Sequence, residues 1–321
     1  MSAPIAAVID IGSNSIKLLV AQRTLDGGVA PLAVRSLDAR ISAGISAAEP
    51  RLTDEGIVRG LDAIRMLLEA AAPFAPVRTV LVATSAVRDA HNGAAFREHV
   101  QAATGHELRI LTGDEEANLI GRGLTTDTAL HGLQDFYVFD LGGGSLECLA
   151  FRARQIEQAR SLQLGCVRLT ERFVADPTRP LPPSAVAAIG AYTRDAFQHS
   201  GFTFSLPAEA VAVGTGGTVT TARAILAAHE GRTFESTPAL VTVEQIHELL
   251  RWLGAMTLAE RQQVGALPPA RADIFPTALA TLLATAELGR FRGFINSVHN
   301  LRYGVADEML GAGTKQLSDE S

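Results

Sequence analysis

The chain has 321 residues, a length that predicts two domains at the usual size of about 100 to 200 residues each. Hydrophobic residues make up 47% of the chain and charged residues 19%, so the composition provides apolar material for packed cores and excludes a disordered protein. The 28 Lys and Arg residues against 34 Asp and Glu give a net charge of −6, which excludes a surface coated in basic residues for non-specific nucleic-acid binding.

The first part of the chain alternates between strand and helix patterns. Short apolar runs rich in β-branched residues predict strands, and a Thr followed by acidic residues before a helical pattern predicts a helix start. We expect strands at 5–11, 15–22, 29–35, 77–84 and 108–111, and helices at 53–72, 93–103 and from 113 onward.

The same patterns resume after a polar stretch at 125–134, where we place the domain boundary. The last third is mainly helical in pattern, with a proline-rich break before it. We expect strands at 136–142, 146–151, 156–163, 210–213 and 294–298, and helices at 167–174, 184–200, from the Gly-Thr segment to 228, and at 243–254, 258–264, 270–288 and 301–311.

A short motif occurs twice in the same context. The sequence DIGSNS at 10–15 recurs as DLGGGS at 140–145, and each copy follows one apolar strand and precedes another. A repeated motif in a repeated context is the signature of duplicated structure. The sequence therefore predicts two domains of like architecture, each beginning with a strand, a glycine turn and a strand.

Glycine-rich turns at strand ends predict phosphate binding. Glycines let backbone N–H groups approach an oxyanion closely, and a helix N-terminus adds a favourable dipole. For a single such turn a plain hairpin is an equal alternative, but three turns favour phosphate. The candidate residues are Gly12, Ser13, Asn14 and Ser15, with Lys17 just beyond; Gly142, Gly143, Gly144 and Ser145; and Gly214, Thr215, Gly216, Gly217 and Thr218.

An acidic residue begins each copy of the motif. Asp10 and Asp140 each end an apolar strand, where a carboxylate is placed to hold Mg²⁺ against phosphate oxygens. The alternative is a carboxylate that only accepts hydrogen bonds from the turn.

Cysteine and histidine usage points to the cytoplasm and away from zinc. Cys148 and Cys166 are too few for a disulfide framework, and the eight histidines lack zinc-ligand spacing. The N-terminal segment lacks a basic start, and no apolar run approaches the ~18 residues of a membrane helix. We expect a cytoplasmic protein that does not enter a membrane.

Six segments occur in an order that carries a family resemblance. They are AVIDIGSNSIKLLV, VATSAVRDAHNG, ILTGDEEANLI, VFDLGGGSLE, LGCVRL and AVGTGGT. The chain resembles the exopolyphosphatase and guanosine pentaphosphate phosphohydrolase family, within the actin-like, sugar kinase and heat-shock-70 ATPase superfamily. The likeness runs from Ile5 to about Thr218, and more loosely through the C-terminal helices.

The resemblance implies an α/β fold of two ribonuclease-H-like domains with a cleft between them, in a short two-domain form. The first domain is expected to comprise 1–125 and a returning C-terminal helix at 300–321, and the second 126–299. Glu116 matches the catalytic base, which would orient a water and accept its proton. Asp140 and Glu147 match metal-binding acids, and Arg88 and Asn92 match a segment beside the substrate phosphates.

Several alternatives stay open at this point. Glu115, next to Glu116, fits a first-turn helix acid better but differs by only one residue in register. Arg88 has an alternative role in an ion pair with Asp89 or Glu115. The chain reads LRYG at 301–304 where the family usually reads LREG, so Tyr303 puts a polar contact there in question.

A cluster of six arginines against three acids lies between Phe151 and Pro180. One hypothesis is that part of this cluster, including Arg168 and Arg172, lines a track for a long polyanion. The alternative is an ordinary solvated face.

The leading functional prediction is an exopolyphosphatase that uses Mg²⁺, or Mn²⁺, to release the terminal phosphate of inorganic polyphosphate. The alternative within the family is the 5′-phosphohydrolase of guanosine pentaphosphate. A kinase or ATPase on the same fold and a non-catalytic polyphosphate sensor are the other classes considered. No nucleic-acid or membrane partner is expected, and the resemblance suggests a homodimer.

Overall fold

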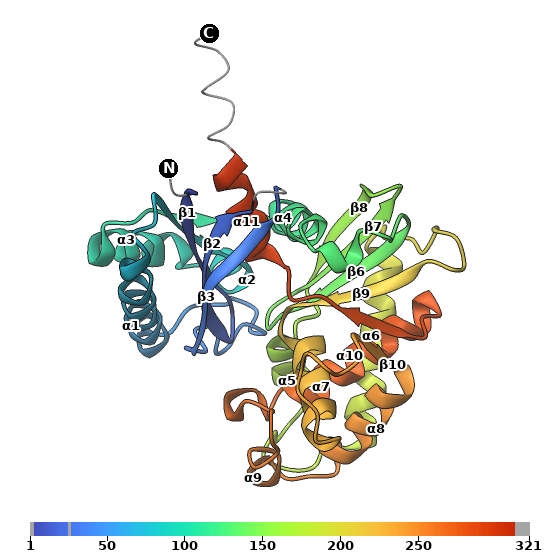
Figure 1. Cartoon of the computed structure of the whole chain (residues 1–321). Helices are drawn as coiled ribbons and strands as arrows, with labels where there is room; N and C mark the ends of the chain where they lie inside the picture. The colour runs from blue at the N-terminus through green and yellow to red at the C-terminus, as the bar shows by residue number, and fades with distance from the viewer. Residues whose placement is uncertain (1–2, 25–26, 312–321) are drawn as a thin grey trace. The chain divides into compact units, whose positions relative to one another are not determined.

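The computed structural model describes residues 3–24 and 27–311, which form two compact units (Figure 1). Of the described residues, the first unit holds those up to Gly132 together with His299 to Gly311, and the second holds Leu133–Val298. Residues 312–321 of the predicted first domain lie outside the described part of the chain. No helix in the described ranges combines the length and apolar character needed to cross a membrane.

The first unit is a five-stranded sheet in the order β3-β2-β1-β4-β5 with helices on both faces. The first three strands form an antiparallel meander, and β4 and β5 run parallel to β1. Its elements are β1 (Ile5–Ile11), β2 (Ser15–Arg23), β3 (Val29–Asp38), α1 (Asp54–Ala71), β4 (Arg78–Ala83), α2 (Ser85–Arg88), α3 (Gly93–Thr104), β5 (Leu108–Ile110), α4 (Gly113–Thr125) and α11 (Leu301–Gly311), with 3₁₀ turns at Ala72–Phe74 and Thr128–Leu130.

Alternating residues of the central strands divide between the two faces of this sheet. Ile9 of β1 and Leu18 of β2 pack with Ile64 of α1 and Phe96 of α3 in one buried cluster. Helices α4 and α11 pack against each other, and α11 contacts β1 and β2. Because strand side chains alternate, Asp10 belongs to the α11 face rather than to the cluster that contains Ile9.

The second unit is a six-stranded sheet in the order β10-β11-β9-β6-β7-β8. Again three strands form an antiparallel meander, and β9 runs parallel to β6. Its elements are β6 (Phe136–Leu141), β7 (Leu146–Arg152), β8 (Gln155–Leu162), α5 (Cys166–Phe173), α6 (Pro183–His199), β9 (Val211–Thr215), α7 (Gly216–His229), β10 (Leu240–Thr242), α8 (Val243–Gly254), α9 (Leu258–Arg261), α10 (Phe275–Gly289) and β11 (Gly293–Asn296), with a 3₁₀ turn at Pro269–Arg271.

The two units share one plan, as the repeated motif predicts. In each, a glycine turn joins the first two strands of the meander, and a strand parallel to the first follows and leads directly into a helix. The α/β class is confirmed, and so is the like architecture of the two halves.

Two predicted helices differ from the structure in their bounds, and two short elements were not predicted. The predicted helix 270–288 begins only at Phe275, because Pro276 suits the first helical positions and a 3₁₀ turn precedes it. The predicted helix 258–264 ends at Arg261. Strand β10 and helix α2 were not predicted, because three or four residues are too short to show a period.

The LRYG segment packs α11 closely onto α4. A side chain at Gly304 or at Gly123 would overlap backbone atoms of the facing helix, so both positions accept only glycine at this spacing. Tyr303 is buried and stacks on the His299 ring, with the ring centroids 3.9 Å apart. The Tyr that departs from the family pattern therefore fills a packed position in the first unit.

Acidification should destabilise the protein through His299. Its ring nitrogen Nδ1 lies 2.7 Å from the Thr126 hydroxyl, and burial lowers the pKa of His299 below its ordinary 6.5 despite the charge of Asp127. The unfolded chain then binds this proton at higher pH than the folded chain. Stability is therefore full above pH 6.5 and falls as the pH drops toward the lowered pKa.

Denaturant unfolding at a series of pH values checks this prediction. The wild type should lose stability below pH 6.5 more steeply than His299→Gln, by up to about 1.4 kcal/mol per pH unit. Equal slopes of unfolding free energy against pH in the two proteins would show that His299 does not contribute to the pH dependence of stability.

Candidate functional site

The first glycine turn lies at the carboxyl end of β1. The Gly12 N–H donates to the Ser15 carbonyl at 3.2 Å, and the Ser13 hydroxyl lies 3.4 Å from the hydroxyl of Ser85, which begins α2 after the parallel strand β4. The Asn14 Oδ1 accepts from Arg40 at 3.2 Å, but its buried Nδ2 has no hydrogen-bond partner in the described part of the chain. A buried amide donor without a partner is costly, and an anionic ligand would satisfy it.

Arg88 and Glu116 form an ion pair at the carboxyl ends of β4 and β5. Arg88 Nη1 lies 2.7 Å from Glu116 Oε2 and also donates to the Leu111 carbonyl at 3.2 Å. Glu116 stands in the first turn of α4, and its side chain is only 7% exposed. The pairing alternative for Arg88 is thus partly correct: it contacts Asp89 at 3.4 Å and Glu116, but not Glu115 in any pair that the structure shows.

The structure separates Glu115 from Glu116. Glu115 forms a capping box with Thr112 and pairs with Arg109, and its side chain is 43% exposed. The Thr112 backbone hydrogen bond and the Arg109 contact lower the pKa of Glu115. Glu115 therefore stabilises the start of the helix, while Glu116 points inward to Arg88.

Two other predicted residues of the first unit have structural partners. The Asn92 side chain donates to and accepts from the backbone of Leu52, at 2.9 Å in both directions. Asp10 lies opposite Lys17 in the strand register; burial raises the pKa of Asp10, and the charges of Lys17 and Arg302 oppose that rise. Asp10 therefore lies on the α11 face of the sheet, near the charges of Lys17 and Arg302.

The second glycine turn repeats the geometry of the first. The Gly142 N–H donates to the Ser145 carbonyl at 3.0 Å, as Gly12 does to Ser15. Asp140 lies directly opposite Glu147 in the β6–β7 register, so both carboxylates emerge on the same face. The Ser161 hydroxyl donates to Glu147 at 2.8 Å and holds it in place.

The third glycine turn lies beside the second. Asp140 is level with Thr215 across the parallel strands, and its carboxylate lies against Gly216, where φ is +74° and a side chain would overlap it. The Thr218 hydroxyl donates to the Leu141 carbonyl at 2.9 Å. The start of the 14-residue helix α7 is thereby fixed next to the second turn.

Asp140 and Glu147 fit a magnesium ion in number and chemistry. Mg²⁺ binds through one or two carboxylates, several waters and substrate phosphates rather than through a cage of protein ligands. Within residues 3–24 and 27–311, no group of three or more His, Cys, Asp or Glu side chains is arranged to hold a metal. The two carboxylates therefore suit an ion whose remaining ligands are water and phosphate.

Arg271 is a candidate that the sequence analysis missed. Its guanidinium lies where a side chain on Gly217 would be, and Nη2 is 3.4 Å from the Thr218 hydroxyl. Its charge also opposes the burial that raises the pKa of Cys166, whose thiol donates to the Gly142 carbonyl at 3.3 Å. Arg271 therefore stands close to both turns, although its PPAR context shows no phosphate motif.

The six arginines between Phe151 and Pro180 do not support the predicted track. Arg168 is 8% exposed and donates to the Gly144 carbonyl, so it cannot line a surface. The guanidinium of Arg172 stacks over the Tyr192 ring at 4.3 Å. The charge count was correct, but the side chains serve separate local structures.

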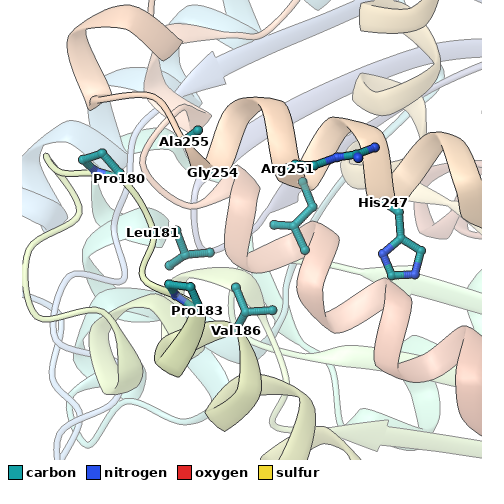
Figure 2. A pocket seen from close by; sticks show the side chains of 9 residues that line it. Pro180, Leu181, Pro183, Val186, His247, Arg251, Gly254 and Ala255 are labelled. Carbon is teal, nitrogen blue, oxygen red and sulfur yellow. The ribbon is translucent and has the colours of Figure 1, made fainter.

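A cavity of about 660 Å³ lies elsewhere in the second unit, between α6 and α8 (Figure 2). Leu181, Pro183 and Val186 line it together with His247 and Arg251. None of the residues predicted for phosphate or metal binding lines this cavity. Its mainly apolar lining also makes it unsuited to a polyanion.

Comparisons with known proteins place the chain in a family. A model of the Ppx/GppA phosphatase family matches residues 19–312. The fold is similar to that of an exopolyphosphatase from Cytophaga hutchinsonii, with a TM-score of 0.86 and 23% identity, covering 96% of this chain and 98% of that one. It is also similar to the PPX-GPPA enzyme of Aquifex aeolicus, with a TM-score of 0.76 and 24% identity, covering 96% and 100%.

These likenesses confirm the predicted fold of two ribonuclease-H-like, or actin-like, domains. The family match begins within β2, after the first glycine turn, and covers the helix of Glu116 and the second and third glycine turns in a single span. The chain belongs to the Ppx/GppA phosphatase family, as its motifs predicted.

Proposed function

We propose that the protein is an exopolyphosphatase that hydrolyses the terminal phosphoanhydride bond of inorganic polyphosphate. The observation that carries the proposal is the buried Glu116 carboxylate, 2.7 Å from Arg88 and beside the strand ends that carry the first glycine turn. A carboxylate there is placed to act on water, and a guanidinium beside it is placed to hold a phosphoryl group.

In the proposed reaction a water oxygen attacks the terminal phosphorus in line with the bridging oxygen. Glu116 orients this water and accepts its proton as the new P–O bond forms. The bond between phosphorus and the bridging oxygen breaks, and its electron pair stays with the shortened chain. Arg88 stabilises the negative charge on the terminal phosphoryl oxygens through its planar pair of donors.

Backbone amides supply most of the phosphate binding in this proposal. The turns that begin at Gly12 and Gly142 present N–H groups, and the start of α7 adds a helix dipole. The buried Asn14 amide and the Arg271 guanidinium add side-chain donors. This set needs little net positive charge, which agrees with an overall charge of −6.

Asp140 and Glu147 would hold Mg²⁺, or Mn²⁺ in its place. When bound, the ion would neutralise phosphate charge and polarise a phosphoryl oxygen. Asp10 lacks comparable support as a ligand, since the charges of Lys17 and Arg302 already act on it.

Phosphate release from four substrates tests the proposal: long polyphosphate, short polyphosphate, guanosine pentaphosphate and ATP, each with Mg²⁺. We expect the highest kcat/KM with polyphosphate. A preference for guanosine pentaphosphate would assign the alternative family activity, and a preference for ATP would assign a nucleotidase or kinase-like role. Binding of polyphosphate without turnover would indicate a sensor.

A further inference from the structure

The carbonyl groups of the second glycine turn face the start of helix α5. The Cys166 N–H donates to the Gly142 carbonyl at 3.0 Å, and the Val167 N–H donates to the Gly143 carbonyl at 2.9 Å. The next carbonyl, of Gly144, accepts from Nε of Arg168 at 3.0 Å. Three successive carbonyl groups are thus held from the same side.

This arrangement sets the direction of the turn's N–H groups. In a planar trans peptide, the carbonyl of one residue and the N–H of the next point in opposite directions. Carbonyl groups turned toward α5 therefore turn the N–H groups of Gly143, Gly144 and Ser145 away from it. In the proposed function, these amides bind the substrate phosphates.

The first unit holds its own turn in a related way. Asn14 is the counterpart of Gly144 in the repeat, and its carbonyl accepts from the Arg40 N–H at 2.9 Å. Nε of Arg40 donates to the Asn14 side chain at 3.2 Å. Arg40 adopts a left-handed φ of 37°, and Nη2 of Arg59 donates to the Arg40 carbonyl at 3.0 Å. In each unit, an arginine after the third strand holds the fifth residue of the repeated motif, Asn14 or Gly144.

We propose that Arg168 is a positioning residue that keeps the second glycine turn in its phosphate-binding conformation, with Arg40 as its counterpart in the first unit. This inference rests on the proposed function. Arg168 acts through the Gly144 carbonyl and is buried, where a charge-assisted hydrogen bond is strong. Its contribution is to substrate binding at the turn rather than to the chemical step.

Three substitutions at Arg168 separate positioning from direct charge contact. Arg168→Met removes the donor and should raise KM for polyphosphate by about tenfold, with kcat changed far less. Arg168→Gln keeps an uncharged hydrogen-bond donor and should raise KM less than Arg168→Met does. Arg168→Lys keeps the positive charge but not the donor position of Nε, so its KM should be no lower than that of Arg168→Gln.

Arg172→Met is the matched control. Arg172 lies one turn further along the same helix, where its guanidinium stacks on Tyr192. This variant should keep the wild-type KM for both long and short polyphosphate. Thermal unfolding of each variant, together with calorimetric titration with tripolyphosphate, shows whether an altered KM reflects binding by a folded protein.

The outcomes distinguish this inference from the proposed function. A wild type that cleaves no polyphosphate contradicts the proposed function, whatever the Arg168 variants do. If the wild type is active, an unchanged KM in folded Arg168→Met overturns the positioning role. Full activity in Arg168→Lys, with equal losses of activity in Arg168→Met and Arg168→Gln, would instead assign Arg168 a direct charge contact with the substrate. A loss of activity confined to long polyphosphate would lead to the same assignment.

Discussion

Glu116→Gln is expected to lower kcat for phosphate release by about 10² to 10⁴-fold, the usual contribution of a general base. The Gln amide has nearly the shape of the carboxylate, so the packing of α4 should persist, but it cannot accept the proton of the attacking water. KM should change little, since the glycine turns bind the phosphates. Steady-state kinetics with polyphosphate and Mg²⁺ measure both quantities.

Glu115→Gln is the control for this substitution, because it makes the same chemical change one residue away. Gln at this position retains a capping-box interaction, and the Glu115 side chain is 43% exposed. We expect nearly wild-type kcat and a small loss of stability. Loss of activity in Glu115→Gln with retention in Glu116→Gln would reverse the assignment of the base.

Gly165→Ala is expected to lower kcat/KM by about 100-fold, because displacement of a binding group by about 1 Å has effects of that size. Gly165 has φ −61° and ψ 146°, which any residue adopts, so the effect is purely steric. A methyl group there would overlap the backbone of Gly143 and Gly144 and push the second turn out of place. The overlap should also lower the free energy of unfolding by about 1–3 kcal/mol.

Gly190→Ala in α6 is the matched control for this substitution. The added methyl would meet only the end of the Arg194 side chain, at an ordinary 3.5 Å. Helical propensity favours Ala over Gly by about 1 kcal/mol, so this variant should be active and at least as stable as the wild type. Steady-state kinetics and denaturant unfolding of Gly165→Ala and Gly190→Ala check both predictions. Full activity in Gly165→Ala would contradict the phosphate-binding role of the second turn.

Much of the fold followed from local patterns in the sequence. The motif at Asp10 and its copy at Asp140 predicted two like units, because a repeated strand and turn context reflects repeated structure. Strand β10 was not predicted because its three residues are too few to show a clear period, whereas β5, of the same length, was predicted.

The site was only partly predictable, for physical reasons that particular residues show. Glu115 and Glu116 could not be separated by motif alone, since their directions depend on where α4 begins, and the Thr112 cap fixes that point. Arg271 was missed because it reaches the third turn from a segment about 50 residues away in sequence, with no local signal. Arg168 was misread as part of a charged surface because composition does not show burial.

Transfer of labelled oxygen tests the central claim most directly. Polyphosphate is incubated with the wild type and Mg²⁺ in water carrying a heavy oxygen isotope, and the products are analysed by mass spectrometry. If water activated at Glu116 attacks the terminal phosphorus, each released orthophosphate carries one labelled oxygen and the shortened chain carries none. Label in the remaining chain would contradict attack of water on the terminal phosphorus. Release of internal fragments in place of orthophosphate would contradict hydrolysis of the terminal phosphoanhydride.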